Sequence, residues 1–174
     1  KISGTLDYET NPTYDFTVNV SDGTHTSAHS VSVTVTNINE APTGSATMAA
    51  SSFAENISVG STIATINATD PESDIISYSL SGTGSNKFSI ANNGVITTAG
   101  ALDYETVSSY NLTVTISDGN NSSTQNITIT VADMSLSSLA TTLAASTFSE
   151  SSSTGTAIAS VASISNPDNE TITY

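Results

Sequence analysis

A 96-residue internal repeat is the feature that most restricts what this chain can fold into. Residues 6–10 (Leu-Asp-Tyr-Glu-Thr) recur unchanged at 102–106, and residues 14–23 recur with small changes at 110–119. Self-similarity at a fixed period indicates modules that stack in a row. We therefore predict the C-terminal part of one repeat at 1–40, a complete repeat at 41–134 and the N-terminal part of a third at 135–174. Since both ends then fall inside a module, we expect a longer array.

Within the repeat, apolar and polar side chains alternate with a period of two. Tyr110, Leu112, Val114 and Ile116 are separated by polar residues, which predicts a strand with one buried face. Further strands are expected at 62–67, 75–80, 87–90 and 95–98, with Asn93-Gly94 as a hairpin turn, and along Ile127, Ile129 and Val131 after a turn at 118–121. No segment has a helical stripe. About seven short strands per repeat predict an all-β fold of tandem seven-stranded Greek-key β-sandwich modules of the immunoglobulin-like type.

The charge of the chain excludes several classes of partner. Lys1 and Lys87 are the only basic residues besides two histidines, against sixteen acidic residues, and the net charge is -14. Binding nucleic acid or anionic lipid needs Lys and Arg, so we expect neither partner, whereas cations are compatible. No apolar run approaches the roughly 20 residues of a membrane span, so no membrane insertion is expected in this segment.

The ordered set of motifs resembles tandem cadherin-type repeats, in the form found in large bacterial surface proteins. The motifs are Leu-Asp-Tyr-Glu at 6–9 and 102–105, Ser-Asp-Gly at 21–23 and 117–119, Asn-Ile-Asn-Glu-Ala-Pro at 37–42, Phe-Ala-Glu-Asn at 53–56 and Asp-Pro-Glu at 70–72. They cover the whole length in the order of the family. The resemblance implies rod segments, outside the cell or on its surface, with calcium ions at the junctions between repeats.

At the first junction, the resemblance implies calcium ligands from both repeats and from the linker between them. The implied ligands are Asp7, Glu9, the Ile38 carbonyl, Asn39, Glu40, Asp70, Glu72 and Asp118. Calcium takes about six to eight oxygen ligands, and this set offers only oxygens. Carboxylates from three segments repel one another when they gather, so a cation is needed to neutralise them.

The second junction departs from this pattern. Leu136 replaces Glu40, Ser135 replaces Asn39, and Asn166 replaces Asp70. The implied ligands that remain are Glu55, Asp103, Glu105, Asp133 and Asp168. Because a leucine cannot ligate calcium, we expect weaker binding and a more flexible joint there.

Three classes of function follow from these observations. We favour a structural, calcium-stiffened spacer in a long extracellular fibre or adhesin, whose partners are neighbouring repeats of the same chain and, in a fibre, other copies. The alternative is an adhesive module that mediates homophilic, carbohydrate or protein binding at the cell surface. An enzyme is not expected, because the sequence offers no nucleophile–base pair and repetition of a whole module is typical of structural proteins.

Overall fold

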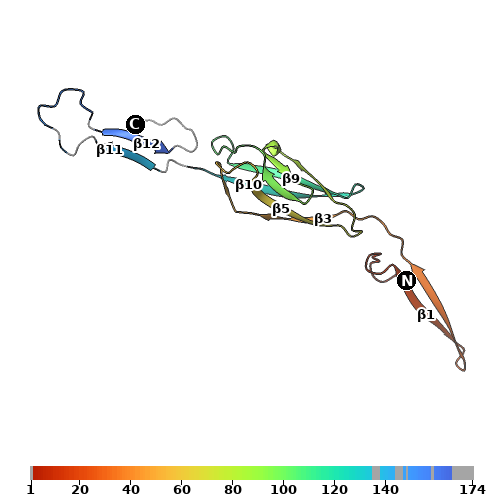
Figure 1. Cartoon of the computed structure of the whole chain (residues 1–174). Helices are drawn as coiled ribbons and strands as arrows, with labels where there is room; N and C mark the ends of the chain where they lie inside the picture. The colour runs from red at the N-terminus through yellow and green to blue at the C-terminus, as the bar shows by residue number, and fades with distance from the viewer. Residues whose placement is uncertain (1, 135–137, 144–146, 148, 158, 166–174) are drawn as a thin grey trace.

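The chain forms a row of three parts, with one complete β-sandwich in the middle (Figure 1). The computed structural model describes residues 2–134, 138–143, 147, 149–157 and 159–165. A strand pair formed by β1 (Thr13–Ser21) and β2 (Thr26–Thr34) lies at one end, and β11 (Ser138–Leu143) with β12 (Ala159–Ser165) lies at the other. No helix in the described part of the chain is long and apolar enough to cross a membrane.

The central sandwich consists of two four-stranded sheets. Its strands are β3 (Thr43–Met48), β4 (Phe53–Ala54), β5 (Thr62–Thr69), β6 (Ser77–Ser81), β7 (Phe88–Ile90), β8 (Val95–Thr98), β9 (Ser109–Ser117) and β10 (Ser122–Ala132), and a single 3-10 turn, η1 (Ser85–Lys87), precedes β7. One sheet has the order β4-β10-β9-β6 and the other has the order β3-β5-β8-β7. The short strand β4 pairs in parallel with β10, whereas every other pair in the sandwich is antiparallel. The predicted all-β sandwich is confirmed.

Alternation of apolar and polar residues places one face of each sheet in a common core. Leu112, Val114 and Ile116 on β9 are buried with Ile129 on β10 and Ile63 on β5. Full burial of each large aliphatic side chain stabilises the fold by about 1.5–3 kcal/mol. Phe88 and Tyr110 meet edge to face in this core, with ring centres 5.2 Å apart. The sandwich is therefore a firm support for the loops at its two ends.

The β1–β2 pair has the same register as β9–β10, and the β11–β12 pair starts in the register of β3–β5 before it shifts between Ala140 and Thr141. β1 pairs with β2 from Thr13 opposite Thr34, as β9 pairs with β10 from Ser109 opposite Thr130. β11 likewise starts with Ser138 opposite Ser165, as β3 starts with Thr43 opposite Thr69. These matches extend the sequence repeat to backbone pairing. The division at 40 and 134 itself stays a prediction.

The predicted strand positions agree with the structure, with three differences. β3 and β4 were not predicted, because 43–54 contains mostly Ser, Thr, Ala and Gly and so lacks a strong apolar alternation. β6 begins at Ser77 rather than at Ile75, whose side chain is 91% exposed. Lys87 belongs to the 3-10 turn rather than to β7.

The hairpin predicted at Asn93-Gly94 joins β7 and β8. Gly94 has φ +79, a left-handed conformation that suits glycine. Its amide donates to the Ala91 carbonyl, and its carbonyl accepts from the Ile66 amide on β5. A Cβ atom at this position would lie 2.2 Å from the Ile66 carbonyl oxygen. The loop and the sheet thus pack together because residue 94 has no side chain.

Gly94→Ala tests this close approach. Gly60→Ala is the matched control, because Gly60 has φ +90 but nothing within 4 Å of an added Cβ. The control should cost about 1 kcal/mol in the free energy of unfolding, the penalty of the left-handed backbone alone. Gly94→Ala should cost at least about 3 kcal/mol, because the clash with a backbone carbonyl adds to that penalty. Urea unfolding measures both values, and equal losses would contradict this packing.

Candidate metal centre

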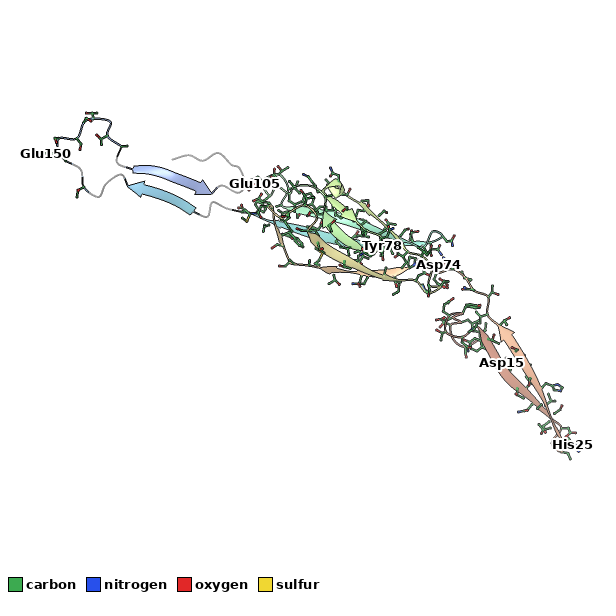
Figure 2. The ribbon with its side chains drawn as sticks, viewed as in Figure 1. Asp15, His25, Asp74, Tyr78, Glu105 and Glu150 are labelled. Atoms are coloured by element: carbon green, nitrogen blue, oxygen red, sulfur yellow. The ribbon has the colours of Figure 1, made fainter. Side chains whose placement is uncertain are left out.

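The acidic residues of the sandwich lie only in the loops at its two ends. Strands β3 to β10 contain no Asp, Glu, Lys or Arg. Figure 2 shows Asp74 at the end that faces β1 and β2, and Glu105 at the opposite end. Asp70 and Glu72 share the loop of Asp74, and Asp118 contacts the linker at that end. Glu55 and Asp133 lie with Glu105 at the other end, and Asp103 precedes Glu105 by two residues. Negative charge is therefore concentrated at the joints between the three parts.

The loop after β5 is folded around the Asp70 side chain. Asp70 Oδ1 accepts hydrogen bonds from the Glu72 amide at 3.1 Å and the Asp74 amide at 3.0 Å. Ser73 follows with φ 65, the only positive φ outside glycine in the described residues. This arrangement leaves Asp70 Oδ2 and Glu72 Oε1 buried with no hydrogen-bond partner. Buried polar atoms are almost always paired, so two orphaned carboxylate oxygens point to a missing positive group.

Three glutamates from three segments meet at the first junction. Glu9 precedes β1, Glu40 lies in the linker, and Glu72 follows β5, and one carboxylate oxygen of each lies within 4.8 Å of the others. The Glu40 amide donates to Glu72 Oε2 at 3.4 Å. Close contact with the Glu72 carboxyl, followed by desolvation and the charges of Glu72, Glu9 and Asp7, raises the pKa of Glu40. The ion-free cluster is thus electrostatically unfavourable.

The other predicted ligands of the first junction lie around this cluster. Asp7, Ile38 and Glu40 line a cavity of about 630 Å³ between the two parts, together with Glu9 and Pro71. Asp7 accepts hydrogen bonds from the amide and hydroxyl of Thr10, which lower the pKa of its carboxyl.

Asp118 is bound to its own turn and to the linker. Its Oδ1 accepts the amides of Asn120 and Asn121, both at 2.6 Å, and its Oδ2 accepts the side-chain amide of Asn39 at 2.8 Å. Hydrogen bonding, led by the Asn121 amide, lowers the pKa of Asp118. Of the eight predicted ligands, three form the glutamate cluster, four hold loops or the linker in place (Asp7, Asn39, Asp70 and Asp118), and Ile38 lines the cavity.

The second junction holds a carboxylate cluster of its own, built from Glu55, Glu105 and Asp133, again within 4.8 Å. Glu55 is only 6% exposed, and its oxygens accept the Tyr104 amide at 3.0 Å and the Met134 amide at 2.8 Å.

Asp103 is not a member of this cluster; it caps its own loop through the amide and hydroxyl of Thr106, which lower the pKa of its carboxyl. The predicted ligand Asp168 and the replacements Ser135, Leu136 and Asn166 lie outside the described residues. The described part of this junction therefore comes from the central repeat alone.

The geometry of both clusters fits calcium. Two oxygens bound to one calcium ion, each at about 2.3–2.6 Å, can be no more than about 5 Å apart. The carboxylate separations of up to 4.8 Å meet that limit. The candidate ligands are oxygens, without His or Cys, and such sets favour calcium, magnesium or manganese over zinc or copper. The orphaned oxygens of Asp70 and Glu72 supply the acceptors that such an ion would satisfy.

Two residues that were not predicted from the sequence hold the linker in place by hydrogen bonds. The Asn121 side-chain amide donates to the Asn39 carbonyl at 2.6 Å, and the Ser123 hydroxyl donates to the Pro42 carbonyl. Asn121 takes the place that His25 has in the preceding repeat, so the repeat pattern gave no signal for it. Ser123 is one hydroxyl among many in this chain.

Comparison with known proteins connects this architecture to cadherins. Residues 50–132, most of the central sandwich, match the family model of the cadherin domain. Mouse Protocadherin Fat 4 is 37% identical over 117 residues, which are 63% of this chain and 2% of that protein. The Drosophila melanogaster Protocadherin-like wing polarity protein stan is 36% identical over 134 residues, 70% of this chain and 4% of that protein. The chain thus spans a small part of these relatives.

Solved structures support the same fold. PcdhgB3 EC1-4 is 30% identical with a TM-score of 0.63, over 76% of this chain and 34% of that chain. Protocadherin Gamma B2 extracellular cadherin domains 3-6 are 25% identical with a TM-score of 0.60, over 78% of this chain and 34% of that chain. The sandwich therefore has the cadherin fold. These relatives are animal proteins where an organism is given, so the expected bacterial origin has no support from them.

Glu72→Gln should weaken calcium binding at the first junction by tenfold or more. The change keeps the shape of the side chain but removes the charge from a residue of the glutamate cluster that has an orphaned oxygen. Asp74→Asn is the matched control, because Asp74 lies in the same loop and outside the cluster. Isothermal titration with calcium compares the two variants, and equal affinities would contradict a site centred on Glu72.

The titration of Glu40 provides an independent test. In chelator its carboxyl should titrate above the ordinary value for Glu, because neighbouring carboxylates raise its pKa. As the pH falls through that raised pKa, protonation should relieve repulsion and stabilise the ion-free joint. Calcium favours the charged form, so adding it should move the midpoint below the ordinary value. Carbon-13 NMR of the Glu40 carboxyl follows both shifts. A titration midpoint that does not change when calcium is added would contradict direct ligation of calcium by Glu40.

Proposed function

We propose that this chain is a calcium-stiffened spacer from a long extracellular protein built of tandem cadherin-type repeats. The observation that carries the proposal is the concentration of acidic groups at the joints, where three glutamates from two repeats and a linker face one another. A calcium ion there would join the three segments through shared ligands. The location is extracellular or at the cell surface, as for the extracellular cadherin domains that this chain resembles.

Each residue of the first junction has a distinct task in this proposal. Glu9, Glu40 and Glu72 would hold the ion, and Asp70 would contribute its free Oδ2 while its Oδ1 maintains the loop. Bound calcium neutralises carboxylate charge and fixes the distance between segments. Since the glutamates belong to both repeats, the same event limits bending between them. The function is therefore mechanical, and the partners are neighbouring repeats of the same chain.

The second junction would bind calcium more weakly. Glu55, Glu105 and Asp133 form a cluster there, but Glu55 already accepts two backbone amides. Leu136 stands where the first junction has Glu40, so one central carboxylate is missing. The proposed rod would accordingly bend more easily after the central repeat than before it. Such unequal joints would give a long array preferred points of bending.

The alternative is an adhesive module that binds its partner through its own surface. The relatives include protocadherins, and such a role is compatible with the cadherin fold. The outer face of the β6-β9-β10 sheet, however, presents Ser, Thr and Asn, without charges or aromatic rings to mark a binding surface. Catalysis is not part of the proposal.

Terbium luminescence can examine the two junctions separately. Terbium shares calcium's preference for oxygen ligands, and it emits when a nearby tyrosine absorbs light. Tyr8 adjoins Glu9 at the first junction, and Tyr104 adjoins Glu105 at the second. We expect Tyr8→Phe to remove the emission that appears at low terbium concentration and Tyr104→Phe to remove a later component. Calcium should displace both components.

The outcomes of this titration separate the candidate functions. Loss of the low-concentration component in both Tyr8→Phe and Glu72→Gln would support ion binding at the first junction. Absence of sensitised emission, or emission that survives both changes, would contradict the spacer proposal. A glycan array or pull-down with the calcium-loaded chain would then test the adhesive alternative.

A further inference from the structure

The linker is attached to the repeat that follows it. The Asn39 carbonyl accepts a hydrogen bond from the Asn121 side chain, and the Asn39 side chain donates to Asp118 Oδ2. The Pro42 carbonyl accepts from Ser123, and the Pro42 ring is buried. Residues 39–42 therefore have side-chain and backbone contacts with the turn between β9 and β10 and with the start of β10.

Within the described residues, the hydrogen bonds from this linker to other segments go to the repeat that follows it. Among the described residues, no hydrogen bond joins 2–12 to 37–42. Ile38 is 73% exposed, and Glu40 meets Glu9 only as a like charge. We propose that Asn121 is a positioning residue for the first junction, which holds Asn39 and Glu40 on the central repeat.

The turn that carries Asn121 also occurs in the preceding repeat, but the Asn121 side chain has no counterpart there. The turn is the same in both repeats, since Asp22 Oδ1 accepts the amides of Thr24 and His25 as Asp118 Oδ1 accepts those of Asn120 and Asn121. His25 has a ring in the place of the amide, and its Nδ1 lies 3.8 Å from Asp22 Oδ2. The repeated turn therefore does not by itself provide the donor that holds Asn39.

Asn121 would help calcium bind without touching the ion. Glu40 lies next to Asn39, so fixing residue 39 on the central repeat keeps Glu40 beside Glu72 before any ion arrives. Binding then costs less ordering of the chain, and pre-ordering of this kind increases affinity. Only this effect on affinity rests on the proposed function. The attachment of the linker can be measured without calcium.

Nitrogen-15 relaxation of the chain in chelator tests the attachment of the linker. Backbone order parameters of Asn39 and Glu40 should match those of β9 and β10. In Asn121→Ala the values for Asn39 and Glu40 should fall clearly below those of β9 and β10. If Asn39 and Glu40 are already clearly less ordered than β9 and β10 in the unmodified chain, the inference is overturned without reference to any variant.

Calcium affinity provides the second readout. Asn121→Ala should weaken binding at the first junction about fivefold, the effect of losing one ordinary hydrogen bond. Asn120→Ala is the matched control, because Asn120 contributes its backbone amide to Asp118 and no side-chain bond to the linker. Both variants should unfold at the same urea concentration. Equal calcium affinities and equal order parameters in the two variants would overturn the role of Asn121.

These measurements also distinguish the inference from the proposed function. Absence of calcium binding in every form of the chain, with Asn39 still ordered through Asn121, would refute the spacer proposal and leave the role of Asn121 in holding the linker intact. Normal calcium binding with a mobile Asn39 would refute the attachment of the linker through Asn121 and leave the spacer proposal intact.

Discussion

Repulsion between carboxylates that face one another across a joint is the constraint on which the rest of this molecule depends. Glu9, Glu40 and Glu72 come from three segments, and their oxygens lie within 4.8 Å of one another. Such an arrangement is unfavourable without a cation and becomes a shared binding site with one. The strands of the central sandwich carry no charge, so the electrostatics of the repeat act almost entirely at its ends. In the proposed role, calcium would change the stiffness of the joints with little change inside the modules.

Aspartates and glutamates have different roles at these joints. Four aspartates accept backbone amides of their own loops, which the short side chain reaches easily: Asp7, Asp70, Asp103 and Asp118. The longer glutamate side chains of Glu9, Glu40 and Glu72 extend into the joint. The aspartates thus shape the loops, which the buried core of the sandwich supports. The three glutamates are positioned to bind a cation. Glu55 is the exception, since it is buried and binds two backbone amides.

Much of this architecture could be predicted from sequence, because it depends on repetition and on a period of two. The alternation of Leu112, Val114 and Ile116 with polar residues predicted β9, and Asn93-Gly94 predicted the hairpin between β7 and β8. β3 was missed because its alternation rests on residues as small as Ala46. The grouping of Glu9, Glu40 and Glu72 into one cluster, with Asp7 and Asp118 engaged elsewhere, depends on loop geometry that no motif encodes. The role of Asn121 arises from a single side-chain contact between residues 82 positions apart, and it leaves no pattern in the chain.

The central claim is that calcium at the first junction restrains the two repeats relative to each other. Electron–electron double resonance measures this directly, because the chain has no cysteine and spin labels at Ser30→Cys and Ser79→Cys would be unique. Both positions are exposed, one on β2 and one on β6, on opposite sides of the joint. The account predicts a broad distance distribution in chelator that narrows in millimolar calcium, and that stays broad when Glu72→Gln is added. Identical distributions with and without calcium would contradict it.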